Sequence, residues 1–471
     1  MDKNIILMSD SYKYSHSRQY PPQMTYMHHY IESRGGRYGY TQFFGLQYYL
    51  KKYLCQPITQ AMIDEAEQIM RLHGLPFDRE NWQYILQQHQ GYLPLKIRAV
   101  PEGSLVNNHN VLLTVENTDP RCAWLVSFFE TLLLKVWYPC TVATLSNSYH
   151  RICRKFLQET ADSLDALPFM LHDFGYRGVS SEESAQLGGA AHLLNFKGTD
   201  NVGALLMLRQ YYHAEMAGFS VPAAEHSTIT SWSKTREVEA YEHLLDTYQN
   251  SVISIVVDSY DYYKTIEEAF CGKLAEKVKQ RKFPLVLRPD SGDAISNVLF
   301  ACERLENTFG VTVNSKGYKV LNNVKVLQGD GINENSAWDL LKALKDNQYS
   351  VENVILGCGG SLLQGNLTTS INRDTHRFAM KCSCVITEGK LVDVYKAPIT
   401  DKGKVSKKGR LDLIWNGEKY QTINIDHLPL NQYAENSMMQ TVFEDGKLLV
   451  DWCLDDIQYN AQKNQPKIEQ Q

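Results

Sequence analysis

The stretches VISIVVDSYD (residues 252–261) and PLVLRPDSG (residues 284–292) decide the fold. Each begins with a short apolar run and turns at once into a polar loop that carries aspartates. A continuous apolar run of this length, bounded by polar and glycine-bearing loops, is typical of a strand buried on both faces. The residues between the two stretches have helical composition. Together they predict a parallel sheet with crossover helices.

The same rhythm recurs on both sides of these stretches. The further apolar runs that lead into polar loops are FMLH (169–172), LLNF (193–196), FSVP (219–222), VKVL (324–327) and NVIL (353–356). Seven such units favour an irregular or incomplete barrel of the (β/α)8 kind, in which the loops after the strands share one face and form the active site. A Rossmann sheet is the alternative, but no Gly-x-Gly-x-x-Gly follows the first strand.

The two ends of the chain have a different pattern. Residues 1–145 mix helical stretches with alternating runs such as 95–100 and 111–115, and alternation returns at 384–387 and 391–395. Alternation of this period indicates strands with one buried face. We therefore expect residues 146–379 to form an α/β-barrel catalytic domain. Residues 1–145 and 380–471 are expected to form one β-rich domain, interrupted by the barrel.

Composition restricts the class of protein. The chain has 471 residues, of which 43% are hydrophobic and 21% are charged, and its formal net charge is -5. These values are ordinary for a soluble globular protein of two or three domains. The negative balance argues against nucleic acid or an anionic membrane as a partner, so any polyanionic ligand must be held by a local basic cluster.

The cysteines and the N-terminus point to the cytoplasm. Ten cysteines are scattered without any Cys-x-x-Cys pair, and Cys382 and Cys384 fit one strand better than a metal site. The apolar run before Ser9 is too short for a signal sequence, and no later run reaches the length of a membrane span. We expect neither a disulfide framework nor a zinc site.

Eight short motifs carry a family resemblance. In chain order they are SDSYK (9–13), LHDFGYRGVSS (171–181), NFKGTD (195–200), VPAAEHSTIT (221–230), DSYD (258–261), RPDSG (288–292), QGDG (328–331) and SKKGR (406–410). Together they resemble the nicotinamide phosphoribosyltransferase family, whose members are type II phosphoribosyltransferases, over nearly the whole chain. The resemblance implies transfer of phosphoribose from phosphoribosyl pyrophosphate to nicotinamide, giving nicotinamide mononucleotide for NAD biosynthesis.

The resemblance also implies how the base is bound. Phe174 would stack on one face of the pyridine ring, and Tyr12 of a second copy of the chain would stack on the other. Asp200 would accept from the amide group and Arg288 would donate to its carbonyl. An ionised carboxylate only accepts hydrogen bonds, so Asp200 favours nicotinamide over nicotinate. The alternative roles are a helix N-cap for Asp200 and core packing for Phe174.

For the sugar and its phosphates the resemblance implies two groups of residues. The ribose and its 5′-phosphate would be held by Arg177, Asp290, Gly329, Asp330, Gly359 and Gly360; Gly357, in the same glycine-rich turn, would also let the backbone approach the phosphate. The pyrophosphate would be held by Arg34, Arg373, Lys381, Lys396 and Lys404, with Lys407, Lys408 and Arg410 nearby. A lysine-rich loop is otherwise a solvated surface. Mg²⁺ would be bound mainly by pyrophosphate and water, with no certain protein ligand.

His226 is the most specific assignment that the resemblance makes. The matching histidine is phosphorylated by ATP, and hydrolysis of the phosphohistidine drives the transfer; imidazole nitrogen is a competent nucleophile. Asp258 and Asp261 would orient the ring, with Glu225 as the alternative partner. With Arg288 and Asp290 these residues complete the expected catalytic set. The family resemblance further implies a homodimer with shared active sites.

Some features depart from the family pattern. The segment GNLTTSIN (365–372) is longer than in animal members, the region after Arg34 is shorter, and Ala379 replaces a serine. These departures indicate a bacterial-type member. Nicotinate phosphoribosyltransferase is the nearest rival. A type I phosphoribosyltransferase, a barrel aldolase using Lys197 and a non-catalytic protein are more distant ones.

Overall fold

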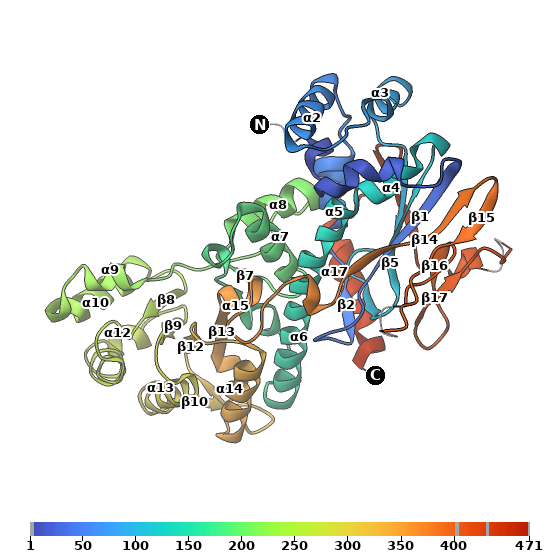
Figure 1. The fold of residues 1–471 in the computed structure, drawn as a ribbon. Coiled ribbons are helices and arrows are strands. Elements are labelled where there is room, and N and C mark those ends of the chain that lie inside the picture. The colour runs from blue at the N-terminus through green and yellow to red at the C-terminus, as the bar shows by residue number, and fades with distance from the viewer. Residues whose placement is uncertain (1–3, 401–404, 430–432, 470–471) are drawn as a thin grey trace. The chain divides into compact units, whose positions relative to one another are not determined.

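The computed structural model describes residues 4–400, 405–429 and 433–469. The chain divides into two compact units (Figure 1). The first, the β-rich unit, comprises Met1–Thr144, Leu208–Ala214 and Ile371–Gln471. The second, the α/β unit, comprises Leu145–Met207 and Glu215–Ser370.

The α/β unit is built on a parallel sheet of six strands in the order β7-β6-β13-β12-β9-β8. Their bounds are β6 Leu171–Asp173, β7 Gly198–Thr199, β8 Ile253–Val256, β9 Leu285–Arg288, β12 Val324–Gln328 and β13 Val354–Cys358. All four residues of β8 are buried, as the continuous apolar run predicts. The sheet is a half-barrel, and a β10–β11 hairpin (Val311–Val313 and Lys319–Leu321) is separate from it.

The run FSVP joins the two edges of this sheet without forming a regular strand. The amide of Thr199, in β7, donates to the carbonyl of Phe219 at 3.0 Å, and the amide of Ser254, in β8, donates to the carbonyl of Pro222 at 2.9 Å. Both contacts are isolated parallel bridges. Six strands and one bridging segment therefore occupy the places of the seven expected strands, and the barrel of eight strands is incomplete.

Helices connect the strands of the α/β unit. They are α7 Glu182–His192, α9 His226–Thr230, α10 Glu237–Thr247, α11 Tyr262–Lys264, α12 Ala275–Lys279, α13 Ala294–Phe309, α14 Glu334–Asp346 and α15 Gly360–Leu363. In Figure 1, α13 and α14 lie beside strands β9, β12 and β13. Side chains fix where several helices begin: Asp293 caps α13 by accepting from the amide of Ser296, and Asn333 forms a capping box at α14.

Both ends of the chain contribute to one antiparallel sheet in the β-rich unit, in the order β15-β14-β1-β5-β3-β18-β19. The strands are β1 Met24–Glu32, β3 Leu95–Ala99, β5 Val111–Asn117, β14 Ala379–Thr387, β15 Lys390–Asp393, β18 Gln440–Glu444 and β19 Lys447–Leu448. Two small ladders pair β2 Tyr40–Gln42 with β4 Leu105–Asn107, and β16 Leu411–Trp415 with β17 Tyr420–Asn424. Cys382 and Cys384 both lie in β14, and every cysteine is free.

The helices of the β-rich unit are α1 Leu46–Tyr49, α2 Gln60–His73, α3 Arg79–Gln88, α4 Ala123–Phe128, α5 Glu130–Leu133 and α17 Leu454–Glu469. Two more, α6 Trp137–Thr160 and α8 Val202–Tyr212, have residues in both units. Among the described residues no single helix could cross a membrane; the bent pair 120–128 and 130–160, at 44°, meets the length and composition criteria only together.

The segment before β14 belongs to the β-rich unit, whereas the expected barrel ended at residue 379. The amide of Arg34 donates to the carbonyl of His376 at 3.1 Å, and the amide of Arg37 donates to that of Thr375 at 3.0 Å. Residues 208–214 also join this unit, and the buried ring of Tyr212 lies 5.1 Å from that of Phe44. The unit boundary therefore lies at 370–371 rather than at 379–380.

Candidate active site

The residues that the sequence analysis expects to bind ligands follow the strands of the α/β unit at the carboxyl end of the sheet. Phe174 follows β6, Asp200 follows β7, Asp258 follows β8, and Gly329 with Asp330 follows β12. Because parallel strands end at the same edge, these residues share one rim, which is where α/β enzymes bind their ligands. Strands β6, β8 and β12 end close to the predicted ends of their apolar runs, whereas β7 (Gly198–Thr199) lies after the run LLNF (193–196), which is not a strand.

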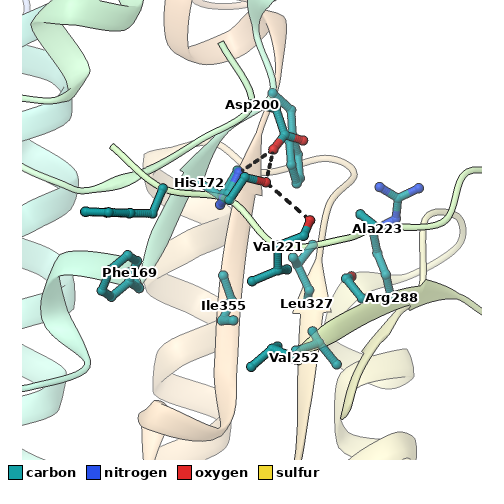
Figure 2. Close-up of a pocket in the computed structure, with 14 residues that line it drawn as sticks. Phe169, His172, Asp200, Val221, Ala223, Val252, Arg288, Leu327 and Ile355 are labelled. Carbon is teal, nitrogen blue, oxygen red and sulfur yellow. Dashed lines mark hydrogen bonds and ion pairs between the residues drawn. The ribbon is translucent and has the colours of Figure 1, made fainter. Parts of the chain in front are cut away.

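A pocket of about 190 Å³ opens at this rim (Figure 2). Its polar lining comes from His172, Asp200, Ser220, Ser254 and Arg288, and its apolar lining includes Phe169, Phe174, Phe219, Val221, Val252, Val286, Leu327 and Ile355. Sites for drug-sized ligands commonly measure ~300–1,000 Å³. The smaller volume and the aromatic lining suit a single flat ring.

The carboxylate of Asp200 is held by two donors on one oxygen. Its Oδ1 accepts from Nε2 of His172 at 2.9 Å and from the hydroxyl of Ser220 at 2.5 Å, as Figure 2 shows. Burial by itself raises the pKa of Asp200, but these hydrogen bonds and the charge of Arg288 hold the pKa below its ordinary value. Asp200 is therefore an anion in this pocket. It does not cap α8, because the amide of Ala204 donates to the side chain of Asn201 instead.

Arg288 provides a donor to the same pocket. Its side chain is largely buried, and its Nε has no hydrogen-bond partner among the described residues. Its closest acid is Asp290, with 3.8 Å between NH2 and Oδ2. A buried N–H without an acceptor is costly, so this geometry favours a ligand that brings an acceptor.

Phe174 is half-buried against a glycine. A Cβ added at Gly357 would lie 2.3 Å from Cε2 of the Phe174 ring. Gly357 therefore makes room for Phe174, and its expected role beside a phosphate stays a prediction. By contrast, a Cβ at Gly360 would meet nothing within 4 Å and one at Gly359 only Phe174 O at 3.9 Å. The space beside these two glycines is open to a ligand.

His226 begins α9 and contacts one of its two expected partners. Its Nε2 lies 3.0 Å from Oδ1 of Asp258, whose Oδ2 accepts from the amide of Asp290 at 3.1 Å and from the hydroxyl of Ser291 at 2.5 Å. Asp261 instead caps α11 by accepting from the amide of Lys264 at 3.1 Å. No hydrogen bond among the described residues joins Asp261 to His226, so its orienting role stays a prediction without a direct contact to support it.

The remaining residues predicted on this rim are placed more loosely. Arg177 and Asp330 are exposed, and Glu225 binds the hydroxyl of the adjacent Ser227 rather than His226. Gly329 lies close to Asp290, since a Cβ there would come within 2.9 Å of its Oδ1. Lys197 is exposed and does not line the pocket. A barrel aldolase therefore has no support in this geometry.

The β-rich unit has a cationic pocket of its own, of about 580 Å³. Arg34, Arg373, Lys381 and Lys396 line it, with Glu130 and Asp374 among the acids. Burial lowers the pKa of Lys381; the charge of Glu130 raises it, and the nearby charges of Arg34 and Arg373 lower it. Lys404 lies outside the described residues. Lys407, Lys408 and Arg410 pair with Glu32, Asp393 and Asp426.

Tyr12 lies on the surface of the same unit, within a 3₁₀ helix at Ser11–Arg18, and is 56% exposed. Its ring contacts His16 edge to face at 4.8 Å. An exposed tyrosine face of this size is available for stacking.

Comparison with known proteins identifies the family. Residues 169–447 match the model of the nicotinate phosphoribosyltransferase (NAPRTase) family, and residues 4–97 match that of the nicotinamide phosphoribosyltransferase N-terminal domain. The nicotinamide phosphoribosyltransferase of Xanthomonas campestris pv. campestris is 47% identical over 463 residues, which are 97% of this chain and 98% of that protein. The chain belongs to the nicotinamide phosphoribosyltransferase family.

Other relatives agree with this family. The nicotinamide phosphoribosyltransferase of Acinetobacter baylyi is 31% identical, over 95% of both chains. The fold resembles the nicotinate-nucleotide pyrophosphorylase of Pyrococcus furiosus, with a TM-score of 0.65, 14% identity and coverage of 99% of this chain and 97% of that one. It also resembles human nicotinic acid phosphoribosyltransferase, with a TM-score of 0.60, 15% identity and coverage of 98% and 94%. At these identities the likeness shows the fold alone.

Two residues that bind Asp200 in this family member were missed from the sequence. His172 lies two residues before Phe174, and Ser220 directly follows Phe219, both of which line the pocket. Nothing in the single sequence marked either residue as part of a site. The available signal was position: His172 lies in β6 and Ser220 in the bridging segment, both at the edge where the strands end.

A second cluster of ligand-type side chains is fully accounted for by its own contacts. His89, Asp119 and Cys122 bring possible metal-ligand atoms within 4.8 Å of one another. However, Oδ2 of Asp119 already accepts from Tyr84 at 2.9 Å and faces Nε2 of His89 at 2.8 Å. Burial raises the pKa of the Cys122 thiol to about 12, which disfavours the thiolate that a metal needs. Nothing in this cluster points to an ion.

Proposed function

We propose that this chain transfers the 5-phosphoribosyl group of phosphoribosyl pyrophosphate to nicotinamide, giving nicotinamide mononucleotide and pyrophosphate in NAD biosynthesis. It is then a pentosyltransferase on a type II phosphoribosyltransferase barrel. Two relatives are named for this activity, and the chain matches nearly the full length of each. The observation that carries the proposal is a small pocket lined by both an anionic acceptor, Asp200, and an unpartnered donor, Arg288.

A carboxamide matches this pair of groups. It offers N–H donors to Asp200 and a carbonyl acceptor to Arg288, whereas a carboxylate offers acceptors only. The pyridine ring would lie on Phe174, whose position Gly357 allows. The second aromatic face would come from Tyr12 of a partner copy.

The sugar and its 5′-phosphate would lie further along the same rim. Asp290, whose amide is held by Asp258, would bind ribose hydroxyls beside Gly329 and Asp330. The 5′-phosphate would approach the open backbone at Gly359 and Gly360, and Arg177 would add positive charge. Glycines with open space allow a close approach of backbone amides to an anion.

The pyrophosphate would be held by the cations of the second pocket, Arg34, Arg373, Lys381 and Lys396, joined by Lys404. Negative charge grows on this group as the glycosidic bond breaks, so fixed cations stabilise the transition state. Mg²⁺ takes oxygen ligands and retains water, so it needs few protein ligands. The rim carboxylates of Asp290 and Asp330 accept no hydrogen bond from the described residues and fit that chemistry. Bound Mg²⁺ would offset part of the pyrophosphate charge.

The residues would act by position and charge. Asp200, Arg288 and Phe174 orient the pyridine nitrogen toward the anomeric carbon, and Asp290 fixes the ribose. Pyrophosphate leaves, an oxocarbenium-like ribose forms, and the ring nitrogen adds to its opposite face. Holding both reactants in line lowers the entropic part of the barrier. No covalent sugar intermediate is required.

Coupling to ATP would use His226. Its ring is exposed enough to meet a phosphate and is held by Asp258, which fixes its orientation. His226→Ala should abolish ATP hydrolysis and protein phosphorylation and leave ATP-independent transfer. Ser227→Ala, one residue along α9, is the matched control and should retain ATP hydrolysis and protein phosphorylation. ATP hydrolysis that survives in His226→Ala would rule out phosphohistidine coupling.

We also propose a cytoplasmic homodimer whose two active sites each use both subunits. The ten free cysteines support a reducing compartment. The base-binding and sugar-binding residues lie in the α/β unit, whereas Tyr12 and the pyrophosphate-binding cations lie in the β-rich unit. A two-fold dimer builds two equivalent sites from one interface.

The rival reaction uses nicotinate, and one assay separates the two. Purified protein is incubated with phosphoribosyl pyrophosphate, Mg²⁺ and either base, with and without ATP, and the mononucleotides are separated by chromatography. We expect nicotinamide mononucleotide as the main product and a higher yield with ATP. Preferential formation of nicotinate mononucleotide would support the rival, and no product from either base would refute both.

A further inference from the structure

The two oxygens of Asp200 have different surroundings. Oδ1 accepts both protein hydrogen bonds, from His172 at 2.9 Å and from Ser220 at 2.5 Å. No described residue donates to Oδ2. One oxygen therefore fixes the carboxylate, and the other is left to meet a ligand in the pocket.

His172 is held tightly against this carboxylate. Its ring lies 4.9 Å from that of Phe174 at an angle of 40°. On the next strand Gly198 makes room for it, since a Cβ there would lie 2.9 Å from Nδ1. The imidazole is thus fixed between β7 and the proposed stacking ring, with Nε2 directed at Asp200 (Figure 2).

This contact makes the charge of the pocket depend on two residues. With a neutral imidazole that donates through Nε2, the His172–Asp200 pair carries one net negative charge. With a protonated imidazole the pair is neutral. A carboxylate in the pocket is repelled by the first state and not by the second, whereas an amide is neutral and tolerates both.

Resting on the proposed function, we propose that His172 is a specificity-determining residue, whose charge state decides whether the Asp200 site rejects nicotinate. In its neutral form it leaves the Asp200 carboxylate without a positively charged hydrogen-bond donor, so the pocket accepts the amide. When it gains a proton, the pocket admits the carboxylate as well. Histidine is the residue type that can change charge near neutral pH.

Other titratable groups around His172 have to be considered. Asp173, next to it in β6, is fully buried, and burial raises the pKa of its carboxyl group to about 6. His192 of α7 is also buried, and burial lowers its pKa to about 3, so it stays neutral. The charge of Arg288 acts on Asp200 and lowers the pKa of its carboxyl group. His172 is therefore the group in this set that can neutralise Asp200 through a direct hydrogen bond.

The test compares base preference as a function of pH. The ratio of kcat/KM for nicotinate to that for nicotinamide is measured between about pH 5.5 and about pH 8.5. In the wild-type protein the ratio should rise about tenfold as pH falls, which corresponds to about 1.4 kcal/mol. In His172→Gln, whose amide nitrogen can donate where Nε2 does but cannot gain charge, the ratio should stay low and flat.

His172→Lys places a permanent charge beside Asp200 and should give a high ratio at every pH. His213→Gln is the matched control, because it removes an imidazole from a different His–Asp pair, 2.9 Å from Asp451, that does not line the pocket. It should follow the wild-type profile.

Two outcomes would overturn the proposal: a wild-type ratio that does not change with pH, or a His172→Gln profile identical to that of the wild type. If His172→Gln fails to fold, the wild-type profile and His172→Lys still decide. If the wild-type protein showed no transfer to nicotinamide at any pH, the proposed function itself would be refuted.

Discussion

In the proposed function, recognition of the base depends on single polar atoms that have no hydrogen-bond partner among the described residues. The second oxygen of Asp200 can only accept, and Nε of Arg288 can only donate. Phe174 supplies the flat apolar surface of the same pocket. Because one atom accepts and the other donates, the proposed pocket would distinguish two bases of equal size. Shape alone separates such isosteres poorly.

Replacing Asp200 should weaken this distinction. In Asp200→Ser the anion is lost, so the ratio of kcat/KM for nicotinate to that for nicotinamide should rise about tenfold or more, since like-charge contacts cost several kcal/mol. Steady-state assays with each base measure the ratio. Asp246→Ser, which removes an exposed carboxylate from the ion pair with Lys277, is the control. An unchanged ratio in Asp200→Ser would remove Asp200 from base selection.

Gly357 can be tested by a single added carbon. The Cβ of Gly357→Ala would come within 2.3 Å of the Phe174 ring and must displace it. We expect the KM for nicotinamide to rise about tenfold, because the stacking face moves, while the KM for phosphoribosyl pyrophosphate changes little. Gly39→Ala, with nothing within 4 Å of its added Cβ, is the control. A normal KM for nicotinamide would show that the Phe174 ring does not bind the base.

At this scale the sequence predicted residue types better than contacts. The motif residues Asp200, Arg288 and Phe174 do line one pocket. Asp261 was expected beside His226 but caps a helix; it lies five residues beyond the end of β8, where an aspartate can bond to the local backbone instead. His172 and Ser220 escaped notice because their importance comes from a contact with Asp200 across strands.

At the scale of elements, apolar runs predicted the parallel strands but not how the segment FSVP bridges the two edges of the sheet. The run FSVP is short and contains Pro222, which has no N–H for a ladder. It therefore makes single bridges to β7 and β8 instead of a strand. The segment 371–379 has no strong period of its own, so its hydrogen bonds to residues 34–37 could not be read from pattern.

Glu102 is a buried acid that binds the start of the short helix α1, and its contribution to the free energy of unfolding depends on pH. Its oxygens accept from the amides of Gly45 at 3.1 Å and Gln47 at 2.7 Å, at the start of α1. Burial raises the pKa of Glu102 to about 7 from an ordinary 4.5. Its contribution to stability is therefore complete below the unfolded pKa and is lost as pH rises through the folded one.

Glu102→Gln should remove this dependence. Between about pH 5 and about pH 8 the free energy of unfolding of the wild type should fall relative to that of the variant by about 2 kcal/mol. Thermal or urea unfolding at both pH values measures the difference. Glu276→Gln, at an exposed position of α12, should show no such change. A constant difference for Glu102→Gln would mean that Glu102 stays ionised or exposed in the folded chain.

At the scale of the whole molecule, the β-rich unit depends on pairings between distant parts of the chain. Strand β18 pairs with β3, and β14 pairs with β1. Arg98 reaches the fully buried Asp412 at 3.0 Å across more than three hundred residues. Local patterns predict that such strands exist but not which ones pair, since register depends on long-range packing. The expectation that both ends form one domain came from alternating apolar runs at the two ends, and strands from both ends do pair in one sheet.

The proposed division of each active site between two subunits can be tested by mixing inactive variants. Tyr12, in the β-rich unit, would supply a stacking face, and Asp290, in the α/β unit, would anchor the ribose. Homodimers of Tyr12→Ala and of Asp290→Ala should each be poor enzymes. If one subunit's Tyr12 completes the other's site, a hybrid has one site with both defects and one with both residues intact. Random pairing makes half of the dimers hybrids, so activity should recover to roughly a quarter of wild type.

Controls are needed to attribute the recovered activity to hybrid dimers. Each variant is refolded with itself, and hybrids are verified by two affinity tags of different charge. Co-refolding Asp290→Ala with Tyr459→Ala, an exposed tyrosine of α17 that is part of neither pocket, measures the activity contributed by pairing a defective subunit with a sound one. Verified hybrids without recovered activity would mean that each subunit builds its own site. A fully active monomer would lead to the same conclusion, because no residue of a partner could then be required.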